Sequence, residues 1–230
     1  MNEDPIRNHL ETVHARIAEA AKQAGRDPAS IRLLAVSKTF PLADILDAFG
    51  AGQLEFGENR VQELETKVPG SDPRMVWHLI GHLQSNKAEK AVELADCIHS
   101  VDSVKLLNKI DAAARKHGKI QDLLLEVNVS GEESKFGLSG YDALRETAEQ
   151  ALALPAVRLL GLMTMAPLNA DKAVLHATFG GLREFRDRLE QEFSIRLPEL
   201  SMGMSSDYPE AIAEGATIVR IGTAIFGGRG

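Results

Sequence analysis

Short apolar segments alternate with amphipathic ones along almost the whole chain, and this alternation limits the fold more than any other feature. Their lengths and the turn residues between them are typical of buried strands. Strands that alternate with helices form a parallel sheet, because every crossover returns the chain to the same end of the sheet. The apolar segments are residues 31–37, 54–58, 76–81, 97–102, 123–129, 158–165, 199–203 and 217–221.

Helical patterns fill the gaps, at residues 42–49, 61–67, 85–94, 103–117, 141–154, 172–193 and 208–214. Eight strands in this order predict a (β/α)8 TIM barrel, formed by residues 1–230 as a single domain. An open doubly wound sheet is the alternative, but it favours a Gly-x-Gly-x-x-Gly turn after the first strand, where this chain has Ser-Lys-Thr-Phe-Pro. The chain after Gly222 is too short for a full eighth helix. We expect an extra N-terminal helix, from Pro5 to about Gly25, to cover that part of the ring.

Charge and composition exclude several classes of protein. The net charge of -7 argues against a nucleic-acid-binding surface. The one cysteine, Cys97, leaves no internal disulfide and predicts a buried thiol in a reducing compartment. His78 and His82 have the i, i+4 spacing of metal ligands, but Gly81 lies between them, so we predict no metal. Neither a signal peptide nor a membrane-spanning run is present, which predicts a cytoplasmic protein.

Lys38 stands at the carboxyl end of the first strand, on the same face as Leu34 and Val36. Burial favours the neutral amine, which can attack a carbonyl and form a Schiff base. The alternative is a lysine that only reaches out to solvent.

Small and hydroxyl-bearing residues follow the last two strands. In a barrel these positions commonly hold phosphate. Met202 to Asp207 includes Ser205 and Ser206 after the seventh strand, and Gly222 and Thr223 follow the eighth. Each segment alone fits ordinary helix capping, but together they favour a phosphate site.

Arg220 interrupts the apolar eighth strand and points to the face opposite Val219 and Ile221. A buried arginine needs a partner. That partner is either a strand-end carboxylate, for which Glu58 is available, or a ligand nitrogen or phosphate. Pyridoxal 5'-phosphate (PLP) combines an aldehyde for lysine, a phosphate and a ring nitrogen. Because arginine does not readily give up its proton, it would leave that nitrogen unprotonated and the ring a weak electron sink.

Seven motifs carry a resemblance over nearly the whole chain: AVSKTFP at 35–41, FGENRVQE at 56–63, WHLIGHLQSNK at 77–87, EVNVSGEESKFGL at 126–138, GLMTMAP at 161–167, LSMGMSSDYPEAIAEGAT at 200–217 and VRIGTAIFG at 219–227. The chain resembles the YggS/PROSC family of pyridoxal phosphate homeostasis proteins, whose fold is like the N-terminal barrel of alanine racemase.

The resemblance implies a role for each matching residue. Lys38 matches the lysine that binds PLP, and Arg220 matches the residue that faces the pyridine nitrogen. Asn59 and His82 lie in family motifs at the pocket, although Asn59 could be a helix cap and His82 a loop hydrogen-bonder. Lys135 lies in a family motif too, and a solvated loop charge explains it more simply. The phosphate anchors are matched by Ser205, Ser206, Gly222 and Thr223.

The resemblance implies a carrier that buffers PLP and supplies it to apoenzymes, without substantial catalysis. A PLP-dependent racemase-like enzyme is the first alternative. Alanine racemase, however, needs a tyrosine from a second domain in the other subunit, and neither Tyr141 nor Tyr208 matches it. The second alternative is a class I-type aldolase that uses Lys38 without a cofactor. With no second domain to build a shared site, we expect a monomer, with transient apoenzyme contacts as its only protein partners.

Overall fold

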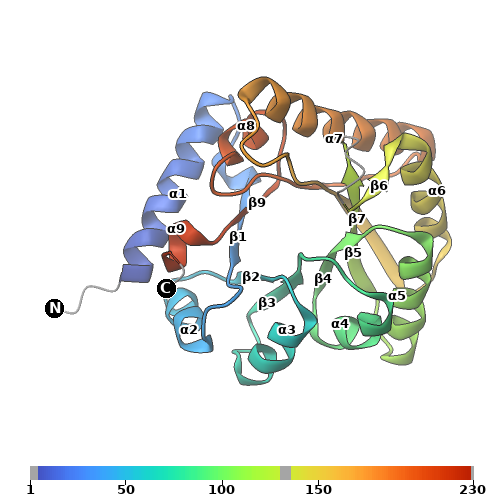
Figure 1. Ribbon diagram of the computed structural model, residues 1–230, viewed down its shortest axis with the longest axis horizontal. Coiled ribbons are helices and arrows are strands. Elements are labelled where there is room, and N and C mark those ends of the chain that lie inside the picture. The colour runs from blue at the N-terminus through green and yellow to red at the C-terminus, as the bar shows by residue number, and fades with distance from the viewer. Residues whose placement is uncertain (1–4, 130–135, 229–230) are drawn as a thin grey trace.

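Eight parallel strands close into a barrel in the computed structural model, which describes residues 5–129 and 136–228 (Figure 1). β1 pairs with β2 on one side and with β9 on the other, and pairing between β4 and β5 completes the ring. The TIM barrel predicted from the alternation of strands and helices is confirmed. The strands are β1 (Arg32–Val36), β2 (Glu55–Glu58), β3 (Val76–Leu79), β4 (Cys97–Val101), β5 (Gln121–Asn128), β7 (Val157–Met163), β8 (Glu199–Ser201) and β9 (Ile218–Ile221).

Helices surround this barrel (Figure 1). None of the described helices is both long and apolar enough to cross a membrane. The helices are α1 (Pro5–Gln23), α2 (Leu42–Gly50), α3 (Val61–Lys67), α4 (Ala88–Leu94), α5 (Val104–Lys116), α6 (Gly140–Ala153), α7 (Lys172–Phe193), α8 (Tyr208–Ala213) and α9 (Thr223–Phe226).

Local differences from the predicted elements are small. A two-residue strand, β6 (Leu138–Ser139), pairs with the end of β5 and is too short to leave a pattern in the sequence. The helix predicted at 85–94 begins as a 3-10 turn, Ser85–Lys87, and becomes α-helical only at Ala88.

The N-terminal helix α1 occupies the position that a full eighth helix would take. It packs against α2, α8 and the single turn of α9. Its apolar residues recur at helical spacing, so one face is buried and the opposite face is exposed. The buried residues are Leu10, Val13, Ile17 and Ala21.

Alternate residues of each strand belong to different cores, as the period of two requires. Leu33 and Ala35 belong to the large core between barrel and helices. Inside the barrel lie two separate apolar clusters, one around Leu34, Val36, Ile80 and Ile218 and the other around Cys97, Leu124 and Met163. Cys97 is a buried free thiol, as predicted.

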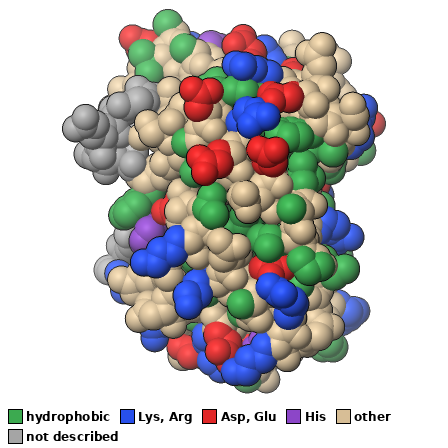
Figure 2. Space-filling model, turned by 90° about the vertical axis from the view of Figure 1, so that its right-hand side faces the viewer, with side chains coloured by type: hydrophobic (Ala, Val, Ile, Leu, Met, Phe, Trp, Pro, Cys, Tyr) green, Lys and Arg blue, Asp and Glu red, His purple; other side chains and the backbone are tan. Residues whose placement is uncertain are grey.

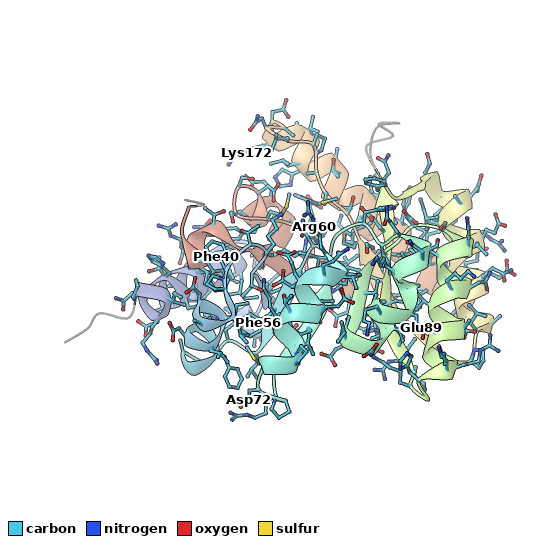
Figure 3. All side chains as sticks on the ribbon, turned by 60° about the horizontal axis from the view of Figure 1, so that its bottom comes forward. Phe40, Phe56, Arg60, Asp72, Glu89 and Lys172 are labelled. Carbon is cyan, nitrogen blue, oxygen red and sulfur yellow. The ribbon has the colours of Figure 1, made fainter. Side chains whose placement is uncertain are left out.

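The two ends of the barrel differ in what they carry. Phe40, Arg60 and Lys172 follow the carboxyl ends of strands and lie at the upper end in Figure 3, whereas Asp72, which precedes β3, lies at the lower end. Among the described side chains on the face that Figure 2 shows, acidic and basic groups are interspersed with small apolar areas. That face carries no continuous basic surface of the kind that binds nucleic acid.

Candidate functional site

A cavity of about 340 Å³ opens at the carboxyl ends of the strands. Of the eight residues predicted for the site, seven line this cavity: Lys38, Asn59, His82, Ser205, Arg220, Gly222 and Thr223. The eighth, Ser206, is exposed on the same loop as Ser205. The structure thus brings together residues from five separate strand ends, as the barrel topology requires.

A buried ion pair supports the backbone next to Lys38. Lys67 Nζ lies 2.6 Å from Glu58 Oε1 and donates to the Ser37 carbonyl at 2.9 Å, while Ser37 Oγ donates to the same carboxylate at 2.7 Å. Burial raises the pKa of Glu58 to about 7, although the hydrogen bonds from Lys67 and Ser37 act to lower it. This cluster fixes the end of β1, from which Lys38 extends into the cavity.

Glu58 is therefore not the partner of Arg220, which was one of the two partners considered from sequence. Arg220 Nη1 donates to Ser201 Oγ at 2.8 Å, and Nη2 donates to the Thr164 carbonyl at 2.9 Å. Burial lowers the pKa of Arg220 to about 10, while the charges of Asp207 and Glu126 act to raise it. Arg220 is only 4% exposed, and it forms part of the cavity wall.

The two loops predicted to bind phosphate lie beside each other at the cavity. The N-cap of α8 is Asp207, and the N-cap of α9 is Gly222, so neither Ser205 nor Ser206 serves as a helix cap. Asp207 Oδ1 instead accepts the Met204 backbone N–H at 2.6 Å and closes the first loop. A Cβ on Gly222 would lie 2.8 Å from the Val36 carbonyl oxygen, so only glycine allows this approach of β9 to β1.

His82 and Asn59 line the cavity at the ends of β3 and β2. His82 stacks on Phe136 with ring centroids 4.0 Å apart, and its Nδ1 lies 3.3 Å from Asp102 Oδ2. Asn59 is not a helix cap, because Arg60 occupies the N-cap of α3. A Cβ on Gly81 would lie 2.3 Å from the Asn59 carbonyl oxygen, so these two loops are in close contact. Lys135 lies outside the described residues.

The sequence analysis missed a polar group inside the barrel. His78, Cys97 and His99 lie with their potential ligand atoms within 4.8 Å of one another. Imidazole and thiolate are zinc ligands, but His78 Nδ1 and His99 Nε2 lie 2.9 Å apart and are joined by a hydrogen bond. Cys97 and His99 alternate on β4, and His78 is the register partner of Cys97. The i, i+2 spacing of Cys97 and His99 indicates this group in the sequence, whereas the metal-ligand prediction rests on the i, i+4 pair His78 and His82.

Known proteins resemble this chain along nearly all of its length. The model of the alanine racemase N-terminal domain family matches residues 9–230. A pyridoxal phosphate homeostasis protein of Pseudomonas aeruginosa is 45% identical over 225 residues, which cover 97% of this chain and 96% of that protein. The one from Aquifex aeolicus is 44% identical over 221 residues, or 96% of each chain. This chain belongs to the pyridoxal phosphate homeostasis protein family.

Solved structures agree with this assignment. PipY of Synechococcus elongatus, crystallised with PLP bound, is 46% identical and superimposes with a TM-score of 0.82, covering 92% of this chain and all of that one. Alanine racemase of Clostridium difficile superimposes with a TM-score of 0.77 at 14% identity, over 99% of this chain and 57% of that one. At that identity the similarity concerns the fold alone.

Proposed function

We propose that this protein binds PLP as a Schiff base on Lys38 and serves PLP homeostasis, by buffering the cofactor and supplying it to apoenzymes. One observation carries the proposal: Lys38, Arg220 and both hydroxyl-bearing loops line a single cavity. Had the amine and the loops lain at opposite ends of the barrel, no single small molecule could contact them all. The PLP bound to PipY supports the choice of ligand.

The residues present suit the parts of PLP. The Lys38 amine condenses with the aldehyde and releases water. Ser205, Ser206, Gly222 and Thr223 offer hydroxyl and backbone N–H donors to the phosphate, and the first N–H groups of a helix have no partner within it. Arg220 would donate to the pyridine nitrogen and, as a donor only, would leave it unprotonated. Asn59 and His82 complete the wall of the pocket.

We propose a carrier rather than an enzyme. PLP gains its power as an electron sink mainly from a protonated ring, and Arg220 opposes that protonation. The homologues named as homeostasis proteins are consistent with this role. We further propose a cytoplasmic monomer that contacts apoenzymes transiently and binds neither nucleic acid nor membrane.

The deciding experiment is an absorbance spectrum of the purified protein loaded with PLP, followed by borohydride reduction and peptide mapping. We expect the visible Schiff-base band and a reduced adduct on Lys38. Lys38→Ala should lose both, and Lys38→Arg, which retains the positive charge but cannot condense with the aldehyde, should lose them equally. Because the side chain extends from the end of β1 and not into a packed layer, both variants in the cofactor-free form should unfold at the temperature of the cofactor-free wild type. An unchanged band in either variant would remove Lys38 from this role.

A racemase-like activity is the second candidate, and the contact between His82 and Asp102 favours it. A carboxylate that orients an imidazole at a pocket wall is an arrangement that many acid–base catalysts use. Its test is the turnover of D- and L-amino acids by the PLP-loaded protein and by His82→Phe. Turnover at ordinary enzymatic rates that His82→Phe abolishes would replace the carrier proposal.

A further inference from the structure

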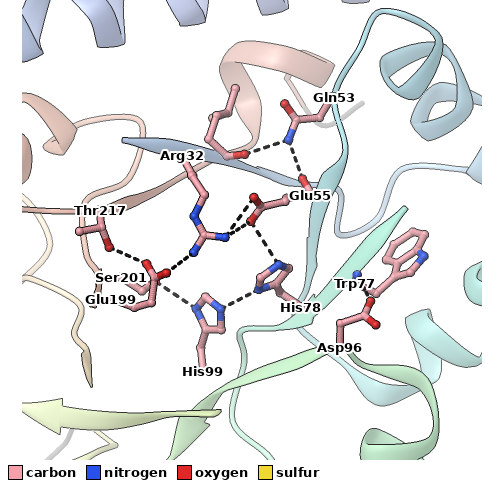
Figure 4. Close-up of polar contacts among 11 residues, drawn as sticks. Arg32, Gln53, Glu55, Trp77, His78, Asp96, His99, Glu199, Ser201 and Thr217 are labelled. Carbon is pink, nitrogen blue, oxygen red and sulfur yellow. Dashed lines mark hydrogen bonds and ion pairs between the residues drawn. The ribbon is translucent and has the colours of Figure 1, made fainter. Parts of the chain in front are cut away.

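A polar chain runs through the interior of the barrel from Arg220 to Glu55, and Figure 4 draws its part from Ser201 to Glu55. Arg220 Nη1 donates to Ser201 Oγ at 2.8 Å, and Ser201 Oγ lies 3.0 Å from His99 Nδ1. His99 Nε2 lies 2.9 Å from His78 Nδ1, and His78 Nε2 lies 3.3 Å from Glu55 Oε2, the longest step. Ser201, His99 and His78 are at most 4% exposed.

The amino end of the barrel anchors this chain. Glu55 is the first residue of β2, and both of its carboxylate oxygens lie 3.2 Å from Arg32 Nη1. Arg32 Nη2 also lies 2.7 Å from Glu199 Oε1. Burial acts to raise the pKa of Glu55, but His78 and Arg32 outweigh it, so the net shift is downward and the group is a carboxylate. The polar chain thus connects the cavity with the opposite end of the molecule.

The chemistry of its two ends favours one direction for the hydrogen bonds between them. An arginine only donates, and a carboxylate only accepts. Burial holds the pKa of His99 well below its usual value, so that imidazole is neutral. In this direction His78 Nδ1 accepts from His99 Nε2–H, His99 Nδ1 accepts from the Ser201 hydroxyl, and the Ser201 oxygen accepts from Arg220. His78 Nε2 faces the Glu55 carboxylate at 3.3 Å but makes no hydrogen bond to the described residues.

Such a chain is unusual in the interior of a barrel, where large branched apolar residues normally fill the layers. Here the apolar residues form two clusters, one from β1, β3 and β9 and one from β4, β5 and β7. Burying polar groups costs free energy unless every one of them is paired. Because the hydrogen-bonded part of this chain ends on Arg220 in the cavity wall, support of that arginine is the role that best accounts for its cost.

We propose that Ser201, His99 and His78 are positioning residues that hold the Arg220 guanidinium in the cavity wall, anchored at the far end of the barrel by Glu55. The chain lets Arg220 stay charged and directed at its ligand although it is buried. The contact of Arg220 with the PLP ring nitrogen rests on the proposed function, whereas the hydrogen positions in the chain do not.

The first test uses the cofactor-free protein and the 15N resonances of its imidazoles and arginine side chains. At neutral pH we expect His99 to be neutral and protonated on Nε2. Ser201→Ala, which removes only a hydroxyl, should shift the His99 Nδ1 and Arg220 resonances. Cys97→Ala is the matched control, since Cys97 lies two residues from His99 on the same strand but outside the chain. A His99 protonated on Nδ1, or resonances unmoved by Ser201→Ala, would overturn the proposal.

The second test uses the PLP-loaded protein. His99→Leu and Ser201→Ala should each release PLP about tenfold faster, the effect of roughly one hydrogen bond to a charged group, and should shift the 15N resonance of the PLP ring. Cys97→Ala should change neither the rate of PLP release nor the 15N resonance of the PLP ring. Wild-type release and ring resonance in folded His99→Leu would refute the proposal, and Ser201→Ala decides the matter if His99→Leu does not fold. A wild type that never binds PLP would instead refute the proposed function and leave the first test standing.

Discussion

Glu126 places a titrating carboxyl inside the barrel near Arg220. It lies on β5 and is only 3% exposed. Its pKa is raised to about 7, first by burial and then by the charge of Asp102, while the positive charge of Arg220 acts in the opposite direction. The field that Arg220 experiences therefore changes within the physiological pH range.

This shift predicts how the free energy of unfolding depends on pH. Between the usual value of 4.5 and about 7, folded Glu126 holds a proton that the unfolded chain releases. Stability from this group is therefore full at low pH and is lost as the pH rises through 7, by at most about 3 kcal/mol. Glu126→Gln cannot titrate, so we expect a flatter stability profile and a more stable protein at pH 8.

Urea unfolding at several pH values measures this profile. Glu149→Gln on α6 is the control, because that side chain is 57% exposed. Equal slopes for wild type and Glu126→Gln would show that the buried carboxyl titrates at its ordinary pH.

At the scale of elements, the close packing of β7 against β8 depends on one glycine. The pairing of β5 with β7 shifts by one residue after Leu123, which leaves Leu160 as a bulge before Gly161. A Cβ on Gly161 would lie 1.8 Å from the Glu199 carbonyl oxygen of β8. Since the obstacle is backbone, a side chain at this position must separate two strands of the barrel.

Gly161→Ala should therefore destabilise the protein by at least about 2 kcal/mol, as overpacking in a rigid core does. Gly50→Ala, at the end of α2, has nothing within 4 Å of the added methyl and should be neutral or slightly stabilising. Thermal unfolding of the two variants makes the comparison. If both unfolded at the same temperature, strands β7 and β8 would have to be further apart than the structure places them.

For the whole molecule, α1 completes the helical layer. It packs against α2 and against α8 and α9 near the other end of the chain, which come together only in the closed barrel. His9 Nδ1 lies 2.9 Å from the Ile225 carbonyl of α9, so α1 also contacts the helix that starts at Thr223 in the cavity wall. Helix α1 therefore both completes the helical layer around the barrel and supports the helix in the cavity wall.

Ile17→Ala tests that contribution. Ile17 is 4% exposed in the core between the barrel and the helices, so its truncation should cost about 3 kcal/mol, of which part is the cavity left behind. Leu152→Ala on α6, where the side chain is 44% exposed, should cost less than about 1 kcal/mol. Chemical unfolding measures both. Equal effects would mean that α1 adds little to the stability of the barrel.

The sequence by itself determined the elements and the end of the barrel at which the site lies. Hydrophobic periodicity is a local property, so it was sufficient to place β1, α3 and α7, and parallel strands must bring their carboxyl ends to one side. The sequence indicated Lys38 and Arg220 as site residues, because burying a charge in or next to an apolar strand costs free energy unless a partner or a ligand compensates for it.

Only the tertiary structure decided the partners of those charges. Glu58 pairs with Lys67 rather than Arg220, and the bulge at Leu160 sets which side chains of β7 point inward. His78, His99 and Ser201 come from three strands that are distant in sequence, and their hydrogen bonds depend on the register and closure of the ring. A pattern along the chain records which face a residue occupies, but it does not record which residue of another strand it meets there.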